Sequence, residues 1–175
     1  YLEFHRGTYT SMAKNKRNNR KCEFMYHNAE LISAVNDVLL HCAYPQEAIN
    51  RGWKGILLNQ FHDIIPGSSI KDVYDESDRM YQKIIKNGNM IINQGYESIA
   101  EQVCTDGGIL VFNNTPFCAS GCAEYDGKTI YAENIPANGY KVIVPKKDNI
   151  VLAVGKNKLE NQFFIIGLTN GNITR

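Results

Sequence analysis

The sequence lacks a long apolar run, a paired-cysteine motif and a large net charge of either sign. No stretch of its 175 residues approaches the roughly 20 apolar residues that a membrane-spanning helix needs, so we expect no membrane partner. The five cysteines are odd in number and include no Cys-x-x-Cys pair, which favours reduced thiols over a disulfide framework. A formal net charge of +1 and 43% hydrophobic residues are too balanced for wholesale disorder.

Hydrophobic residues recur first with a helical period, which predicts three helices at about residues 11–44, 45–63 and 69–103. Three amphipathic helices with short links pack most economically as an antiparallel bundle, which we place at residues 1–104. The buried stripe expected on the first helix consists of Cys22, Met25, Ala29, Ile32, Val35, Leu39 and Cys42.

The helix ends carry signals of their own. Thr10 or Ser11 is expected to cap the first helix, and Ser69 to cap the third, with Asp72 completing a capping box. Gly52 weakens the second helix intrinsically, so we expect it to mark close packing against a neighbour.

After Gly108 the period becomes strand-like, and Asp126-Gly127 and Asn170-Gly171 are residues that tight hairpin turns favour. We therefore predict an α+β fold, in which the bundle is followed by an antiparallel β region at residues 105–175. The expected strands are residues 109–112, 119–125, 129–132, 140–144, 150–154 and 163–168.

A basic run opens the first helix with Lys14, Lys16, Arg17, Arg20 and Lys21. No aromatic residue interleaves these side chains as a stacking platform, and the net charge is close to zero, so nucleic acid is not the expected partner. We interpret the run as solvated helix surface. The alternative, a helical protein-interaction module with a basic contact face for an acidic partner, stays open.

Residues 55–70 combine an apolar run with the polar side chains of His62 and Asp63, followed by the helix-breaking pair Pro66-Gly67. An imidazole suits zinc, and the neighbouring carboxylate supplies a hard oxygen ligand. Both groups are expected near a helix C-terminus, where the backbone dipole favours a cation.

A second interpretation of His62, as a structural histidine, is the commoner one for a lone histidine between apolar residues. Phe61 and Ile64 flank it, as they would flank a structural histidine in a core. Zinc sites usually use three or four protein ligands, and no second ligand lies three or four residues from His62. The residues alone leave both interpretations open.

Three segments resemble one known family. Residues 59–70, beginning Asn-Gln-Phe-His-Asp, resemble the histidine–aspartate motif of the class II α-mannosidases of glycoside hydrolase family 38, in the form of its cytosolic and bacterial branch. Residues 1–11 resemble the segment that leads into the helical middle domain of that branch, and residues 158–164 resemble the start of its C-terminal β-domain. With a first residue Tyr1 instead of methionine, we expect a fragment covering the middle domain and the start of the β region.

The resemblance implies a zinc-dependent retaining glycosidase that removes α-linked mannose from glycans or oligosaccharides, with one carboxylate as nucleophile and another as acid/base. By position, His62 is implied to be a zinc ligand and Asp63 a sugar contact. The remaining zinc ligands and both catalytic carboxylates are implied to belong to an N-terminal α/β domain, which no segment here matches. We therefore expect no catalytic residue and little or no zinc in this fragment alone, and a cytoplasmic parent.

Two further kinds of motif suggest other sites: a phosphate-binding helix start and glycosylation sequons. Gly67-Ser68-Ser69, at a helix start, could cradle the phosphate of a phosphosugar, although Ser69 is expected to be a simple cap. Asn113-Asn114-Thr115 and Asn172-Ile173-Thr174 fit the glycosylation sequon, a pattern that is common by chance.

Overall fold

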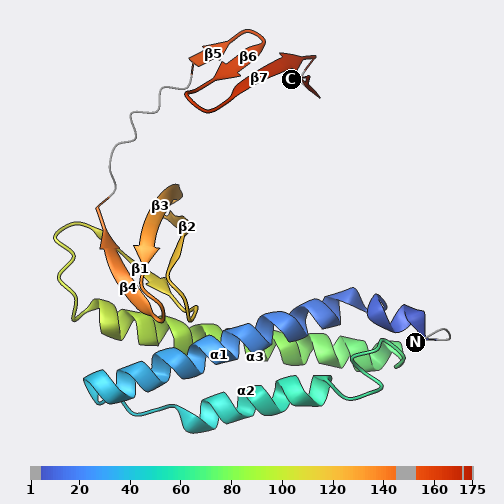
Figure 1. Cartoon of the computed structure of the whole chain (residues 1–175). Helices are drawn as coiled ribbons and strands as arrows, with labels where there is room; N and C mark the ends of the chain where they lie inside the picture. Colours follow the sequence, from blue (N-terminus) through green and yellow to red (C-terminus); the bar gives the residue numbers. More distant parts are fainter. Residues whose placement is uncertain (1–4, 145–152, 171, 175) are drawn as a thin grey trace.

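A computed structural model describes residues 5–144, 153–170 and 172–174. Its helices are a short 3₁₀ turn (Arg6–Tyr9), α1 (Ala13–Leu40), α2 (Gln46–Asn59) and α3 (Lys71–Ala100). The regular elements that follow α3 in the described residues are antiparallel strands, so the α+β prediction is confirmed (Figure 1). Among the described residues, no helix has the length and apolar character needed to cross a membrane.

The bundle core is built around Tyr26 of α1, which is completely buried. A Cβ atom on Gly52 of α2 would lie 1.9 Å from Tyr26 Cε1, and one on Gly88 of α3 would lie 3.0 Å from Tyr26 Cε2. The ring therefore occupies space that both glycines leave open, which confirms the close packing predicted at Gly52. The Tyr26 hydroxyl donates a hydrogen bond to the carbonyl of Ile84 at 3.0 Å. Cys22 lies in the same core, and its burial raises the pKa of its thiol to about 11.

The buried face of α1 is more polar than predicted. The predicted stripe is right at Cys22, Ala29 and Ile32 but wrong at Leu39, which is 68% exposed, and at Cys42, which lies beyond the helix. The buried polar residues of this face are Asn15, Asn18, Ser33 and Asn36. Asparagine is buried where its amide finds a partner: Asn36 Nδ2 donates to the carbonyl of Gly95 on α3 at 3.0 Å.

The predicted helix caps are wrong. The N-cap residue of α1 is Met12, in the left-handed conformation (φ 51°), and that of α3 is Ile70 in extended conformation. Neither helix has a side-chain cap hydrogen bond, so Ser69 and Asp72 form no capping box. At these helix starts the Ser69 amide is instead hydrogen-bonded to the Tyr74 hydroxyl, and Ser11 packs against Gly67.

The first β region forms two antiparallel pairs, β1 with β4 and β2 with β3. Their bounds are β1 (Ile109–Asn113), β2 (Ala119–Tyr125), β3 (Lys128–Ile135) and β4 (Gly139–Ile143). The turn predicted between β2 and β3 is present, because Asp126 and Gly127 both take positive φ (50° and 68°), as a two-residue hairpin of this type requires.

The last described strands form a separate four-stranded antiparallel sheet in the order β5-β6-β7-β8. They are β5 (Ala153–Gly155), β6 (Lys158–Glu160), β7 (Ile165–Thr169) and β8 (Asn172–Ile173). Periodicity missed β6 and β8, which are too short to show alternation. Most of the strand predicted at residues 150–154 lies outside the described residues.

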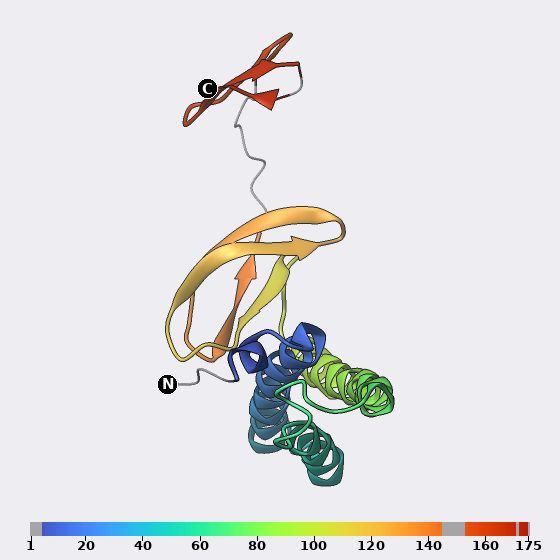
Figure 2. The same cartoon turned by 90° about the vertical axis from the view of Figure 1, so that its right-hand side faces the viewer.

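The β1–β4 strands lie on the side of the bundle formed by α1 and α3, with α2 on the opposite side (Figures 1 and 2). The aromatic rings of Tyr96 on α3 and Phe112 on β1 are 4.4 Å apart between centroids. Asn114 also donates a hydrogen bond to the Tyr96 hydroxyl. These contacts join the bundle to the strands, while the opposite side and the α2–α3 corner stay uncovered by them.

Candidate functional site

The segment between α2 and α3, residues 60–70, forms a sharp corner that we call the corner loop. Its reversal depends on Gly67, whose φ of +94° few L-residues adopt. A Cβ atom on Gly67 would lie 2.6 Å from Cβ of Ser11, so the loop packs directly against the chain that precedes α1. Glycine is therefore required here for both conformation and space.

Hydrogen bonds from two helices hold the backbone of this loop. The Tyr74 hydroxyl of α3 donates to the carbonyl of Ile64 at 3.0 Å and accepts from the amide of Ser69 at 3.2 Å. The Lys16 ammonium of α1 donates to the carbonyl of Ile65 at 2.7 Å and to that of Ser11. The loop is thus closed on itself and fixed to α1.

The start of the loop is held by a polar network between α1 and α2. Gln60 Nε2 donates to Asn19 Oδ1 and to Glu23 Oε1, both at 2.9 Å. Just before it, Asn59 is buried and accepts a 2.5 Å hydrogen bond from the hydroxyl of Ser77 on α3. The end of α2 therefore meets both other helices through buried or half-buried polar groups.

Between these anchors, the side chains of His62 and Asp63 lie on the surface, 77% and 60% exposed. His62 Nε2 is 3.5 Å from Asp63 Oδ2, and the imidazole packs against the Phe61 ring with centroids 4.1 Å apart. The core-histidine interpretation is therefore wrong. The residues also lie beyond α2, which ends at Asn59, so the helix end predicted at residue 63 is wrong by four residues.

The donors in the loop fit part of a zinc shell. An exposed neutral imidazole offers one nitrogen ligand, and the adjacent carboxylate offers oxygen atoms to a metal or to a hydroxyl group. Within the described part of the chain, no cluster of three or more His, Cys, Asp or Glu side chains could hold a metal ion. His62 can therefore contribute to a zinc site only together with ligands from elsewhere.

The structure bears on the two alternatives, the phosphate cradle and the basic contact face. The Ser69 amide is already hydrogen-bonded to Tyr74, so the proposed phosphate cradle lacks this donor. In the basic run, Lys14 pairs with Asp78 at 2.5 Å, Lys16 binds backbone carbonyls, and Arg20 pairs with Glu23 at 2.9 Å. Lys14 and Arg20 nevertheless stay 58% and 71% exposed, so the run is a largely solvated helix surface in which Lys16 alone is half-buried.

Comparison with protein families decides the identity of the domain. A family model described as the alpha mannosidase middle domain matches residues 3–99, which include the whole bundle up to the last turn of α3. The chain belongs to this family. The resemblance to the α-mannosidases seen in its sequence motifs is confirmed.

Curated relatives of this α-mannosidase middle domain are much longer than the chain. Alpha-mannosidase 2C1 from Homo sapiens is 35% identical over 120 residues, which cover 67% of this chain and 11% of the human protein. An alpha-mannosidase from Saccharomyces cerevisiae is 34% identical over 195 aligned positions, covering 94% of this chain and 18% of the yeast protein. The chain therefore spans less than a fifth of either relative.

Solved structures share the fold. An alpha-mannosidase from Enterococcus faecalis matches 67% of this chain and 14% of its own, with a TM-score of 0.62 and 20% identity. A protein of glycosyl hydrolase family 38 from the same organism matches 95% of this chain and 29% of its own, with a TM-score of 0.65 and 16% identity. The second match extends the shared fold beyond the helices of the middle domain.

The residues that hold the corner loop of this middle domain were not predicted. Lys16 was placed with the solvated basic run, and Tyr74 was not singled out. Nothing in the local pattern distinguishes them, because their partners are backbone carbonyls 49 and 10 residues away in sequence. One lysine within a basic run, a single turn into a helix of mixed polarity, carries no signal of that kind.

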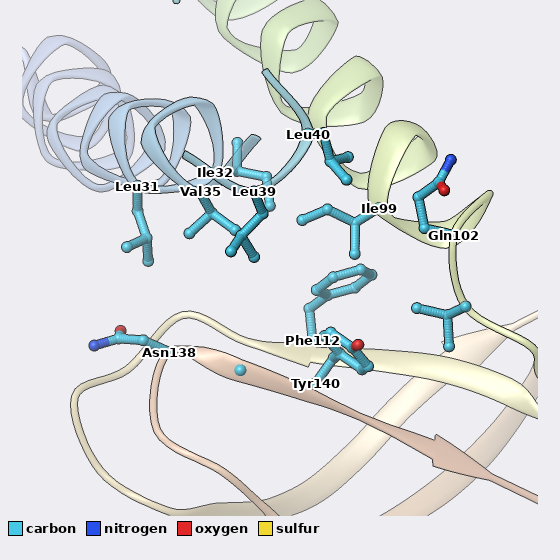
Figure 3. A pocket seen from close by; sticks show the side chains of 12 residues that line it. Leu31, Ile32, Val35, Leu39, Leu40, Ile99, Gln102, Phe112, Asn138 and Tyr140 are labelled. Atoms are coloured by element: carbon cyan, nitrogen blue, oxygen red, sulfur yellow. The ribbon is translucent and has the colours of Figure 1, made fainter. Parts of the chain in front are cut away.

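An apolar crevice of about 310 Å³ lies at the other end of the middle domain, where α1 and α3 meet β1 and β4. Figure 3 shows Leu31, Val35 and Leu39 of α1 facing it, with Ile99 from α3 and the rings of Phe112 and Tyr140 from the strands. It contains no carboxylate, imidazole or thiol. The crevice explains where the misassigned Leu39 points, but it holds no group for hydrolysis.

Proposed function

We propose that this chain is the middle segment of a longer, zinc-dependent retaining α-mannosidase, and that His62 and Asp63 are its contribution to the active site. One observation carries the proposal: an exposed His-Asp pair stands on a firmly held loop in a domain of the α-mannosidase family. An active site needs accessible side chains on a fixed backbone, and this corner supplies both.

In this proposal the two side chains have different roles. The imidazole of His62 would supply a nitrogen ligand to zinc, and zinc, when bound, would supply a Lewis acid for hydroxyl groups of the mannose unit. The Asp63 carboxylate accepts hydrogen bonds from sugar hydroxyls. The nucleophile, the acid/base and the other zinc ligands come from the part of the longer protein outside this chain, so the chain alone is inactive.

The substrate in this proposal is a mannose-containing glycan or oligosaccharide, because the curated relatives carry the name alpha-mannosidase. We place the enzyme in the cytoplasm, as the branch form of the motif at residues 59–70 suggests. Neither nucleic acid nor a membrane is assigned as a partner.

The test uses His62→Ala and Asp63→Asn in the full-length enzyme. The histidine variant should lose most zinc and most mannosidase activity while keeping its folded circular dichroism spectrum. The aspartate variant should keep zinc and lose affinity for the sugar in both ground and transition states. His27→Ala, at an exposed histidine of α1, is the matched control and should change neither zinc content nor rate. Normal zinc and normal turnover in His62→Ala would refute the proposal.

A further inference from the structure

We infer that Tyr74 and Lys16 are positioning residues for His62 and Asp63, and that they set the zinc affinity of the site through the backbone of the corner loop. The inference rests on the proposed function. It starts from two carbonyl groups, those of Ile64 and Ile65, which directly follow the functional pair and receive one hydrogen bond each from a different helix.

The Tyr74 hydroxyl is a two-way bridge across the loop. It donates to Ile64 at 3.0 Å and accepts from the amide of Ser69 at 3.2 Å, which links the two ends of the turn around Gly67. The tyrosine is only 7% exposed, so water does not readily replace this bridge. Removing the hydroxyl leaves one carbonyl and one amide of the loop without this partner.

The Lys16 ammonium is used in an unusual way. It donates to the carbonyls of Ser11 and Ile65 and makes no ion pair with a carboxylate within the described part of the chain. The side chain is half-buried, and desolvation lowers the pKa of Lys16. The ammonium group gives up part of its hydration to bind these two carbonyls. It thereby fixes the backbone of the corner loop relative to α1.

The functional side chains have little else to orient them. His62 touches Asp63 at 3.5 Å and the Phe61 ring, both within the loop itself, and its side chain is otherwise open to solvent. Their direction therefore follows the direction of the backbone that carries them. Outer partners that orient a metal ligand commonly change metal affinity 10- to 100-fold when they are removed.

The experiment compares two tyrosines of α3 in the full-length enzyme. Tyr74→Phe should raise the zinc dissociation constant by up to about 10-fold, the low end of the effect of direct partners, because Tyr74 acts through the backbone; competition with a chelator measures it. Tyr81→Phe is the matched control, because Tyr81 is completely buried and its hydroxyl has no hydrogen-bond partner in the described chain. Its zinc dissociation constant should stay at the wild-type value.

Variants of Lys16 and Lys14 test the hydrogen bond from Lys16 to the corner loop without changing the core around α3. Lys16→Met should weaken zinc binding in the same direction, and Lys16→Arg, which keeps a donor, should restore most of it. Lys14→Met, which removes a lysine whose ion pair with Asp78 is exposed, should leave zinc affinity unchanged. If Tyr74→Phe fails to fold, the lysine series decides the inference.

A readout without metal separates positioning from stability. In the 175-residue chain, the backbone amides of His62 and Asp63 should gain amplitude of motion by nuclear magnetic resonance relaxation in Tyr74→Phe but not in Tyr81→Phe. Zinc loss in His62→Ala with unchanged zinc affinity in Tyr74→Phe and Lys16→Met would overturn the inference alone. Retention of zinc by His62→Ala would overturn the proposed function and the inference together.

Discussion

The side chain of Asn113 holds a turn together from inside the β region. Its Nδ2 lies within hydrogen-bond distance of the carbonyls of Phe117 (2.8 Å), Pro136 (3.0 Å) and Ile135 (3.2 Å). Its Oδ1 accepts from the amide and the hydroxyl of Thr115 at 3.0 and 2.7 Å. Because the amide nitrogen is buried and engaged, the sequon at this position is a structural motif and not a glycosylation site.

Asn113→Ala should therefore destabilise the β1–β4 region by about 1–3 kcal/mol, since it removes a donor from the carbonyl of the buried Ile135 and from the part-buried bonds to the Phe117 and Pro136 carbonyls. The measurement is hydrogen exchange of the β1 and β4 amides. Asn172→Ala, at the other sequon in an exposed strand, is the control and should leave those exchange rates unchanged. Wild-type protection in Asn113→Ala, or a glycan on Asn113 after secretion, would contradict this prediction.

Among the helices and strands, the periodicity of hydrophobic residues predicted where the regular elements lie. All three helices lie within the predicted ranges, and the strands β1 to β4 fall where they were expected. Caps and the polar half of the α1 core were not predictable, because they depend on partners distant in sequence. Ser77 hydrogen-bonds both Asn15 and Asn59, from 62 and 18 residues away, and no local pattern predicts such a bridge.

The contact between α1 and α2 gives a prediction about Gly52. Alanine is the better helix former by about 1 kcal/mol, so Gly52→Ala would stabilise an isolated α2. In the bundle its Cβ atom would lie 1.9 Å from the buried Tyr26 ring, and overpacking of this kind typically costs about 1–3 kcal/mol or more. We expect a net loss of stability in urea unfolding followed by the fluorescence of Trp53.

Gly121→Ala is the control for that experiment. Gly121 lies in β2, and a Cβ atom there would meet no atom within 4 Å. The same chemical change should therefore leave the Trp53 transition in place. An unchanged or raised midpoint in Gly52→Ala would show that Tyr26 can move aside, and the packing argument would fail.

Across the whole molecule, the candidate site and the β strands occupy different ends of the bundle. The corner loop lies between α2 and α3 and packs near the start of α1, whereas the crevice lies between the later turns of α1 and α3 and the strands. The sequence motif predicted His62 and Asp63 as the candidate site, since the pair is contiguous. It could not identify the residues that hold them, because those are assembled only by the three-helix packing.

The predicted division into residues 1–104 and 105–175 can be tested at the contact between the two parts. Phe112 of β1 packs on Tyr96 of α3 and lines the crevice, so Phe112→Ala removes an aromatic pair worth about 0.5–1.5 kcal/mol beyond its buried area. If the bundle is a domain of its own, Trp53 fluorescence should report an unchanged unfolding midpoint, while hydrogen exchange in β1 and β4 accelerates.

Phe117→Ala, at a phenylalanine that is 63% exposed, should change neither readout. A parallel loss of stability in both parts after Phe112→Ala would mean that helices and strands unfold as one cooperative unit, and the predicted boundary would be wrong.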